Sequence, residues 1–368
     1  MSGPLRIHWR LPQRGEGSGS SRMAECEIPD IGLPDLETQI RFCREAELCG
    51  IDSLLVDFGW LKPDAIILST ALGLATSRIR LIIAYRSGLM SPTTFVQQLN
   101  TLSSLIDGRF SLNVVAGYSP EEQRAYGDFL AHDERYARTE EFLAVCNEYW
   151  RTGRAEKDGR YYRIEGGRLY TPFVSSDGAR GPELLIAGGS TQARDLAARE
   201  GTCWMQFVQT PMQIRAMAGP VLDAGKTIGI RAAIVVRPTH EEAVAAARRI
   251  VQRADPEAKV SAGERRFIAA TDSVSMNRGF DSAENEWLTS YLWTGAVRVF
   301  GSAALVLVGS PDEIVEALME YRDVGVTQFI FSGWPKLEEM QVFGREVMPL
   351  LRRREAEESA GARTCASF

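Results

Sequence analysis

LLIAGGSTQARDLA (residues 184–197) contains, in one stretch, the unit from which the fold is built. Four apolar residues run into Gly188-Gly189-Ser190-Thr191, and a helical pattern follows at once. A strand that leads directly into a helix presents free backbone N–H groups at the positive end of the helix dipole, which favours an anion there. The two glycines leave room for a ligand, and Ser190 can cap the helix or donate to the anion. An ordinary tight turn with a serine cap explains the same residues equally well.

The same succession of apolar strand and amphipathic helix recurs along the chain. Each strand-like segment is a nearly continuous apolar run, which is typical of parallel strands buried on both faces. Eight such repeats fit an α/β fold of the (β/α)8 TIM-barrel type better than a doubly wound sheet, and no GxGxxG follows the first strand. The predicted strands lie at residues 4–11, 51–58, 79–86, 109–117, 184–187, 202–208, 229–238 and 327–333.

The repeats predict a single barrel domain over residues 1–351 with two insertions. Residues 154–183 are expected to form a β-hairpin before the fifth strand. Residues 254–309 follow the seventh strand and are rich in Gly, Ser and charge, which indicates a mobile, lid-like segment. A disordered surface excursion explains that composition about as well. Residues 352–368 are charged and then small and polar, as expected of a flexible tail.

Composition excludes several classes of function. The net charge of -6 argues against a nucleic-acid partner. No apolar run approaches the length of a membrane span, and the opening MSGPLRIHWR lacks the core of a signal peptide. The six cysteines form no CxxC pair, and the three histidines are too far apart to suggest a local metal motif. We therefore expect a cytoplasmic protein with reduced thiols, no bound metal and no membrane contact.

Several longer motifs together resemble one family. They are LPQRGEG, LIDGRFSLNVVAG, AHDERYARTEEF, GGSTQARDLAARE, GIRAAIVVRPT, RRFIAATDSV, LVGSPDEIVEAL and FSGWPKLEEMQVFG. In order and spacing they resemble the bacterial luciferase-like superfamily, and within it the two-component FMNH2-dependent alkanesulfonate monooxygenases. The resemblance runs from about residue 5 to about residue 351, and the set is specific although each motif alone is modest.

The resemblance implies a (β/α)8 barrel that uses FMN as FMNH2, supplied by a separate NAD(P)H:flavin reductase. O2 is the co-substrate, and the reduced flavin forms a C4a-(hydro)peroxyflavin that oxygenates a small organic substrate. It also implies a homodimer or homotetramer that pairs through the helices predicted at 63–76 and 91–106. The apolar faces of these helices could equally pack only on their own barrel.

The resemblance also assigns cofactor-binding residues. Gly189 and Ser190 match the turn that receives the FMN phosphate, and Tyr136 matches a residue near the same phosphate. Asn113 and Gly117 lie in the motif NVVAG, whose asparagine is directed at the flavin ring in this family. The alternatives are a satisfied polar group at a strand end for Asn113 and simple packing on a helix for Tyr136.

Other residues are assigned to the substrate side of the pocket. Arg231 and Arg298 match arginines that the alkanesulfonate enzymes use in the active site, and a permanently charged donor fork suits an anion. A salt bridge at the barrel rim is the alternative for Arg231. Asp57, at the end of the second predicted strand, lines the same pocket as Asn113 and is assigned to cofactor binding, while Trp334 is a candidate active-site residue. His8 could supply a further polar contact or be a hydrogen-bonded barrel histidine.

An oxygen-activating flavin needs walls that keep water out. Four aromatic side chains fall at predicted strand ends where such walls would lie, although barrel-core packing would explain them too: Trp9, Trp204, Phe207 and Trp334.

Three departures from the family pattern concern the substrate. The family's active-site cysteine falls near Lys62, its histidine after the strand-seven arginine is Ala233, and the tyrosine of its SGYP motif is Trp334. An imidazole and a phenol, two candidate proton carriers, are thereby lost. We infer that flavin use is retained and that the substrate is not a simple alkanesulfonate.

Two other functions fit the same barrel. An F420-dependent oxidoreductase would transfer hydride without O2, and it would need basic residues near the phosphate turn for the polyglutamate tail of F420. The sequence shows no convincing cluster of that kind. A non-catalytic flavin-binding protein would need neither the two arginines nor a lid-like insertion.

Overall fold

The computed structural model describes residues 3–13, 34–60, 62–254 and 270–365. Eight parallel strands form a closed barrel, because β9 pairs with both β8 and β12. The predicted (β/α)8 fold is confirmed, and each predicted strand overlaps one of the eight. They are β1 (Arg6–Arg10), β2 (Ser53–Val56), β3 (Arg80–Arg86), β4 (Phe110–Val115), β7 (Glu183–Ala187), β8 (Cys203–Phe207), β9 (Thr227–Val236) and β12 (Val326–Ser332).

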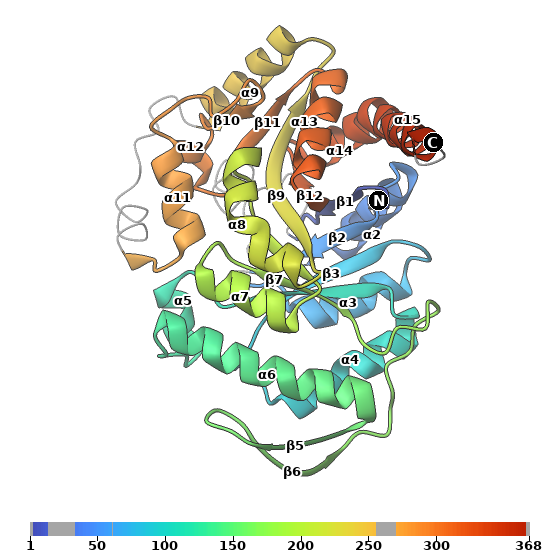
Figure 1. Cartoon of the computed structure of the whole chain (residues 1–368), viewed down its shortest axis with the longest axis vertical. Helices are drawn as coiled ribbons and strands as arrows, with labels where there is room; N and C mark the ends of the chain where they lie inside the picture. The colour runs from blue at the N-terminus through green and yellow to red at the C-terminus, as the bar shows by residue number, and fades with distance from the viewer. Residues whose placement is uncertain (1–2, 14–33, 61, 255–269, 366–368) are drawn as a thin grey trace.

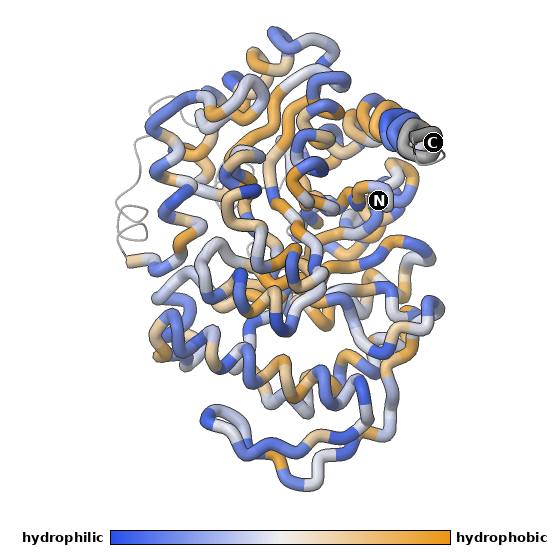
Figure 2. The backbone as a smooth tube through the Cα atoms, in the orientation of Figure 1, coloured by the Kyte–Doolittle hydropathy of each residue, from blue (hydrophilic) through white to orange (hydrophobic). Residues whose placement is uncertain are grey.

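Helices surround the barrel, and the apolar strands lie inside them (Figures 1 and 2). Many helices begin at a Ser, Thr or Asp whose side chain accepts a hydrogen bond from the backbone of the first turn, as in α2, α3, α4, α7, α8 and α13. The helices are α2 (Leu36–Leu48), α3 (Ala65–Leu74), α4 (Pro92–Ile106), α5 (Pro120–Ala125), α6 (His132–Thr152), α7 (Thr191–Glu200), α8 (Pro211–Asp223), α9 (His240–Ala254), α13 (Pro311–Asp323), α14 (Lys336–Val342) and α15 (Met348–Cys365), with a π-helical turn at Phe343–Val347. None of the helices in the described ranges is long and apolar enough to cross a membrane.

Strand alternation decides which side chains point into the barrel. A small apolar cluster, including Leu55, Ile82 and Leu185, fills the interior. Residues in register with this cluster share its face, so Arg10, opposite Leu55, points inward. Its neighbour Trp9 is fully buried on the other face against Phe331 and Phe343, and does not form a wall of the pocket.

The two insertions differ in their relation to the barrel. The hairpin prediction is confirmed by β5 (Arg154–Asp158) and β6 (Arg163–Arg168), which lie beyond α6 and α4 (Figure 1). In the second insertion, residues 255–269 lie outside the described residues. The remainder contains α11 (Val274–Ser282), β10 (Leu292–Trp293), α12 (Val297–Phe300) and β11 (Val306–Gly309). β11 pairs in parallel with the C-terminal half of β9, an extra strand that the sequence analysis missed.

The expected flexible tail is wrong for the part that is described. Residues from Met348 to Cys365 form α15, which lies close to the N-terminal strand (Figure 1). Glu355 is buried there and accepts a 2.6 Å hydrogen bond from the backbone N–H of Leu5. From the sequence alone this charged segment is expected to be a tail, because the residue that its buried carboxylate contacts lies at the other end of the chain.

Candidate active site

A cluster of charges lies at the C-terminal ends of β1 and β2 and in the middle of the long strand β9. Asp57, directly after β2, accepts a hydrogen bond from Nε of Arg10. Its carboxylate lies 2.9 Å from Nζ of Lys62 and 3.8 Å from Nη1 of Arg231. Gln13 holds the backbone of Asp57 with two 2.9 Å hydrogen bonds, one to its carbonyl oxygen and one from its N–H. The carboxylate is therefore fixed among three cations before any ligand binds.

Electrostatics within this cluster perturb two pKa values in particular. Burial alone would raise the pKa of Asp57, but Arg10, Lys62 and Arg231 together hold it well below its usual value. Burial lowers the pKa of Lys62 to about 8, an effect that Asp57 opposes and Arg10 reinforces. The pKa of Lys62 therefore lies close to physiological pH.

A fourth cation, Lys336, lies beside the cluster at the start of α14. Its side chain is buried, and Nζ donates a 3.4 Å hydrogen bond to the carbonyl oxygen of Leu11. Burial, followed by the charge of Arg10, lowers the pKa of Lys336 well below its usual value. Among the described residues no ion pair joins Lys336 to a carboxylate, so in its protonated form it adds to the positive potential of the cluster.

Aromatic rings border the same site. Trp334 is buried and stacks on Phe300 with ring centroids 5.1 Å apart. Both line a small cleft together with Arg10, Arg231 and Lys336. The ring of Phe207 lies 5.7 Å from the guanidinium carbon of Arg231, in cation–π contact. The predicted walls at Trp334 and Phe207 therefore lie against the cations.

The second feature of the barrel mouth is the Gly-Gly-Ser turn between β7 and α7. Ser190 is the N-cap of α7, and its Oγ accepts a 3.2 Å hydrogen bond from the N–H of Ala193. The hydroxyl of Tyr136 is paired with Ser190, and burial raises the pKa of Tyr136, so this hydroxyl remains neutral. Gly188 has a φ of +144°, and its carbonyl oxygen accepts a 2.7 Å hydrogen bond from Nε1 of Trp204. Trp204 therefore supports the turn from outside and does not line the pocket.

Helix α11, from the second insertion, covers this turn. A Cβ added at Gly189 would lie 2.6 Å from Oγ of Ser275 and 3.5 Å from Nη1 of Arg278. Both side chains come from the first half of α11 and face the turn. Hydroxyls from three elements and one guanidinium therefore meet at the N-terminus of α7, and hydroxyl, guanidinium and backbone N–H groups are the donors that bind phosphate.

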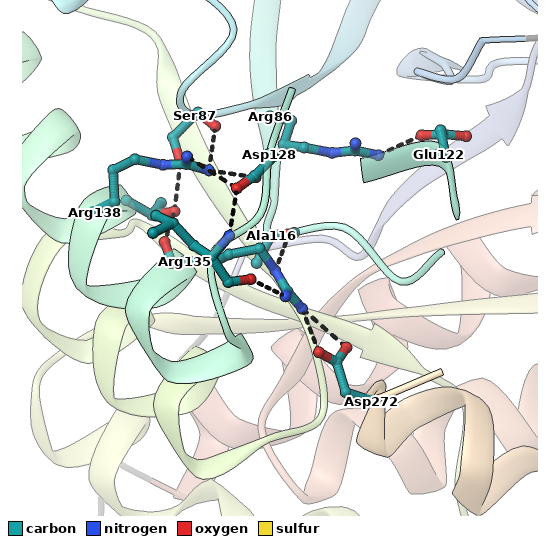
Figure 3. Close-up of polar contacts among 10 residues, drawn as sticks. Arg86, Ser87, Ala116, Glu122, Asp128, Arg135, Arg138 and Asp272 are labelled. Carbon is teal, nitrogen blue, oxygen red and sulfur yellow. Dashed lines mark hydrogen bonds and ion pairs between the residues drawn. The ribbon is translucent and has the colours of Figure 1, made fainter. Parts of the chain in front are cut away.

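A set of buried ion pairs fixes the elements that carry these donors (Figure 3). Arg135 of α6 donates to both carboxylate oxygens of Asp272 at 2.9 and 2.8 Å and to the carbonyl oxygen of Ala116 at 3.0 Å. Arg138, one turn further along α6, donates to the carboxylate of Asp128 at 2.6 Å. Asp272 immediately precedes the cap of α11, so the Arg135 pair joins α6 to α11 on either side of the turn.

Asn113 supplies an acceptor next to the turn. It lies opposite Ala84 and Leu185 in the sheet, and both of these belong to the barrel interior. Its amide therefore faces inward, and its Oδ1 is buried without a hydrogen-bond partner among the described residues. A buried amide oxygen without a partner costs free energy unless a ligand satisfies it.

Arg86, at the end of the neighbouring β3, provides donors of the same kind. It is hydrogen-bonded to Glu122 through one nitrogen, while Nε and Nη1 are buried with no partner in the described part of the chain. Gly117 has a φ of +87°, and a Cβ there would lie 3.1 Å from Nε of Arg86. The glycine thus allows the loop after β4 to pass close to the guanidinium.

These donors and acceptors fit flavin mononucleotide. Its phosphate matches the donor set at the turn, and the hydrogen-bonding edge of its ring matches the unsatisfied atoms of Asn113 and Arg86. The fit rests on chemistry and burial in this chain, independently of the motif resemblance.

The strand order separates the two features. We call the ends of β9, β12, β1 and β2, which are consecutive neighbours in the barrel, the charged half; it contains Arg10, Asp57, Lys62, Arg231 and Lys336. We call the ends of β3, β4, β7 and β8, with the elements that cover them, the cofactor half; it contains Arg86, Asn113, Tyr136, Ser190, Ser275 and Arg278.

Comparison with known proteins identifies the family. The family model described as luciferase-like monooxygenase matches residues 6–328, most of the chain. The protein belongs to the luciferase-like monooxygenase family.

Solved structures show how widely this barrel is shared. EDTA monooxygenase (EmoA) from Chelativorans sp. BNC1 is 20% identical with a TM-score of 0.76, covering 96% of this chain and 94% of that one. A riboflavin lyase (RcaE) with modified FMN and riboflavin is 22% identical with a TM-score of 0.72, covering 96% and 92%. An F420-dependent secondary alcohol dehydrogenase is 18% identical with a TM-score of 0.65, covering 95% and 99%. At these identities the likeness concerns the fold, while the choice of cofactor rests on the residues of the site.

Two of the expected active-site residues of this luciferase-like chain lie elsewhere. His8 is buried inside the barrel with Nε2 3.1 Å from Oε1 of Gln328, and burial lowers the pKa of His8 to about 4. Its other charged neighbours are Arg6 and Glu183, at the N-terminal ends of their strands. His8 is thus a hydrogen-bonded barrel histidine. Arg298 is exposed on α12, where Nη2 donates 3.2 Å to the carbonyl oxygen of Ala283, outside the cluster around Asp57.

The sequence analysis missed several residues that the structure brings to the mouth of this luciferase-like barrel. The alternation in RIHWR places Arg10 on the inward face at the end of a strand, and this signal was available in the sequence. Lys336 follows the SGWP motif directly, but nothing local indicates that its ammonium is buried. Ser275 and Arg278 lie in an insertion, and only the folded chain shows where that insertion packs.

Proposed function

We propose that this luciferase-like protein is a flavin-dependent monooxygenase that acts in the cytoplasm with FMNH2 and O2 on a small organic substrate. Reduced FMN supplies two electrons, so that one oxygen atom of O2 enters the substrate, the other leaves as water and the flavin is released oxidised. The observation that carries the proposal is the cofactor half, where phosphate donors and unsatisfied ring-binding atoms occur side by side.

In this proposal the chain itself binds, orients and shields the reactants. Ser190, Tyr136, Ser275 and Arg278 hold the phosphate. Asn113 accepts a hydrogen bond from the ring. The rigid α6–α11 pairing keeps these donors in place, so little ordering entropy is lost on binding.

The substrate is held by the charged half. Arg231 is retained from the family pattern, while Lys62, Ala233 and Trp334 replace the cysteine, histidine and tyrosine expected of an alkanesulfonate enzyme. The stacked rings of Trp334 and Phe300 restrict water beside Arg231. A changed set of polar groups around a retained arginine supports an anionic substrate other than a simple alkanesulfonate.

An anaerobic titration followed by tryptophan fluorescence tests the proposal. FMNH2, oxidised FMN and reduced F420 are added in parallel to the full chain. We expect FMNH2 to bind at least tenfold more tightly than F420, because the phosphate turn contains few charges for a polyanionic tail. Preference for F420, or no binding of any flavin, would overturn the proposal. Binding of oxidised FMN without turnover would favour a non-catalytic flavin protein.

We also propose a separate NAD(P)H:flavin reductase as partner and assembly into a homodimer or homotetramer. Ile67 and Leu74 of α3 are 73% and 60% exposed and lie two helical turns apart on one face. Sedimentation of the wild type against Ile67→Glu checks the assembly. A dimer or tetramer that dissociates in the variant is the expected result, and a wild-type monomer would contradict it.

A further inference from the structure

The charged half carries more positive charge than the structure neutralises. Arg10, Lys62, Arg231 and Lys336 contribute four positive charges when protonated, and the ion pairs described there all end on the single carboxylate of Asp57. The side chains of Arg10, Lys62 and Arg231 are only 14, 22 and 23% exposed, and Lys336 is 6% exposed as a whole residue. Bulk water and salt therefore screen this excess weakly.

Other buried arginines in the described ranges are paired one to one. Each donates to a carboxylate of its own: Arg86 to Glu122, Arg135 to Asp272, Arg138 to Asp128 and Arg237 to Glu339. Each of these arginines thus has a carboxylate of its own, whereas the cations of the charged half share one. Arg10 and Arg231 alone outnumber the carboxylate of Asp57, and with both lysines protonated the excess is about three positive charges. Such an excess at a partly open cleft calls for a ligand of opposite charge.

The excess is spread over an arc. Arg231 lies in the middle of β9, Arg10 is the last residue of β1, and Lys336 and Lys62 follow β12 and β2. These four strands are consecutive neighbours in the barrel, about 4.8 Å from one to the next. Asp57 draws three of the cations together, while Lys336 is held apart on the carbonyl oxygen of Leu11. An anion with a single charged group would contact only some of these cations. A molecule with separated anionic groups would meet both ends of the arc.

We infer that the charged half binds an organic substrate with two or three carboxylate groups, one held at Arg231 beside Asp57 and another at Lys336. This inference rests on the proposed function, in that the anion is the molecule that the flavin oxygenates. It adds a substrate class and two specificity-determining lysines, Lys62 and Lys336. Neither lysine has a counterpart among the residues that the family resemblance supplies.

Calorimetric titration with a charge series tests the inference. Butyrate, glutarate and tricarballylate carry one, two and three carboxylates and are titrated into the full chain at pH 7 and constant ionic strength. We expect each added carboxylate to tighten binding about tenfold, since each forms a charge-assisted contact. Equal affinity for butyrate and tricarballylate would overturn the inference.

Two matched variants locate the contact. Lys336→Gln should weaken tricarballylate about tenfold and leave butyrate within about threefold, whereas Lys157→Gln, in the remote β5–β6 hairpin, should change neither. Lys62→Gln provides an independent variant on a loop in case Lys336→Gln does not fold. If each folded lysine variant binds tricarballylate as the wild type does, the inference is wrong.

Titration of oxidised FMN into the same preparations separates this inference from the proposed function. If FMN binds but the affinity for anions does not depend on their charge, the proposed function stands and a polycarboxylate substrate is ruled out. If anions bind according to their charge but no flavin binds, the polycarboxylate site stands and the proposed function is overturned. Loss of FMN binding in Lys336→Gln would show that the lysine serves the cofactor and would also overturn the inference.

Discussion

In the function proposed above, the two halves of the barrel mouth both bind anions, but by different means. The cofactor half uses a helix N-terminus, neutral hydroxyls and two arginines, Arg86 and Arg278, and the Arg135–Asp272 ion pair joins two of the helices that carry these groups. The charged half uses four cations around one carboxylate, with the excess left open to a cleft. One half therefore recognises a group by the directions of its donors, and the other by net charge.

This difference has consequences for specificity. Directed hydrogen bonds select the shape of a phosphate and change little between pH 7 and 9. Unbalanced charge selects the number of anionic groups, and it depends on pH and salt. A protein that needs the same cofactor in every cycle and a particular substrate benefits from having both kinds of site.

The largest expected effect comes from removing the one carboxylate of the charged half. Asp57→Asn leaves Arg10, Lys62 and Arg231 facing one another, and should lower the free energy of unfolding at pH 7 by about 3–5 kcal/mol, as measured in urea. Asp223→Asn, on the exposed end of α8, should stay within about 0.5 kcal/mol. If Asp57→Asn lowers the free energy of unfolding by less than about 1 kcal/mol, the three cations do not require the carboxylate in order to lie next to one another.

The next effect concerns the phosphate turn. Ser190→Asp keeps a good helix cap and places a negative charge where the phosphate would bind, so FMN should bind roughly 100-fold more weakly. Riboflavin, which lacks the phosphate, should bind within about threefold of the wild type in the same fluorescence titration. Ser310→Asp, the equivalent cap on α13, is the control. Equal weakening of FMN and riboflavin would place the phosphate elsewhere.

A smaller effect tests the backbone of the same turn. Gly188→Ala requires a side chain at a φ of +144° and a Cβ 2.5 Å from the hydroxyl of Tyr136, so the free energy of unfolding should fall by about 1–3 kcal/mol. Gly219→Ala, where a Cβ would meet no atom within 4 Å, should stay within about 1 kcal/mol. Thermal unfolding measures both. Equal stability of the two variants would show that the turn is not constrained.

The smallest effect distinguishes the halves by pH. Burial lowers the pKa of Lys62 to about 8 among Asp57, Arg10, Arg231 and Lys336, so its charge is present below pH 8 and lost above it. Glutarate affinity should therefore fall by up to about tenfold between pH 8 and 9, while FMN affinity stays level. Lys62→Arg, which keeps the charge, should remove most of this fall. A fall of the same size in Lys62→Arg would assign it to another group.

The same contrast explains what the sequence predicts. Eight apolar runs and the helix that starts at Ser190 depend on residues that are neighbours in the chain, and the barrel and its turn follow from them. The charged half is assembled from strands far apart in sequence. Alternation in RIHWR predicts that His8 and Arg10 share the inward face, but only the folded chain shows that Arg10 reaches Asp57 while His8 lies against Gln328. Tertiary contacts decide these cases.

The contacts that complete the cofactor half are also long-range. The Arg135–Asp272 pair joins residues 137 positions apart, and it places α11 over the turn. The composition of the insertion predicts a mobile segment. Gly, Ser and charged residues are, however, common in polar helices as well as in loops, so composition alone does not reveal α11. In the same way, the helical C-terminus depends on Glu355 reaching Leu5, 350 positions away.

The central claim is that one barrel mouth holds the flavin and an organic anion at the same time, each in its own half. Calorimetric titration of tricarballylate into the chain saturated with oxidised FMN tests this directly. The account predicts one anion bound per chain with a Kd within about threefold of that measured without FMN. An apparent Kd that rises in proportion to the FMN concentration would show that the two ligands compete for one site, and would contradict the division into two halves.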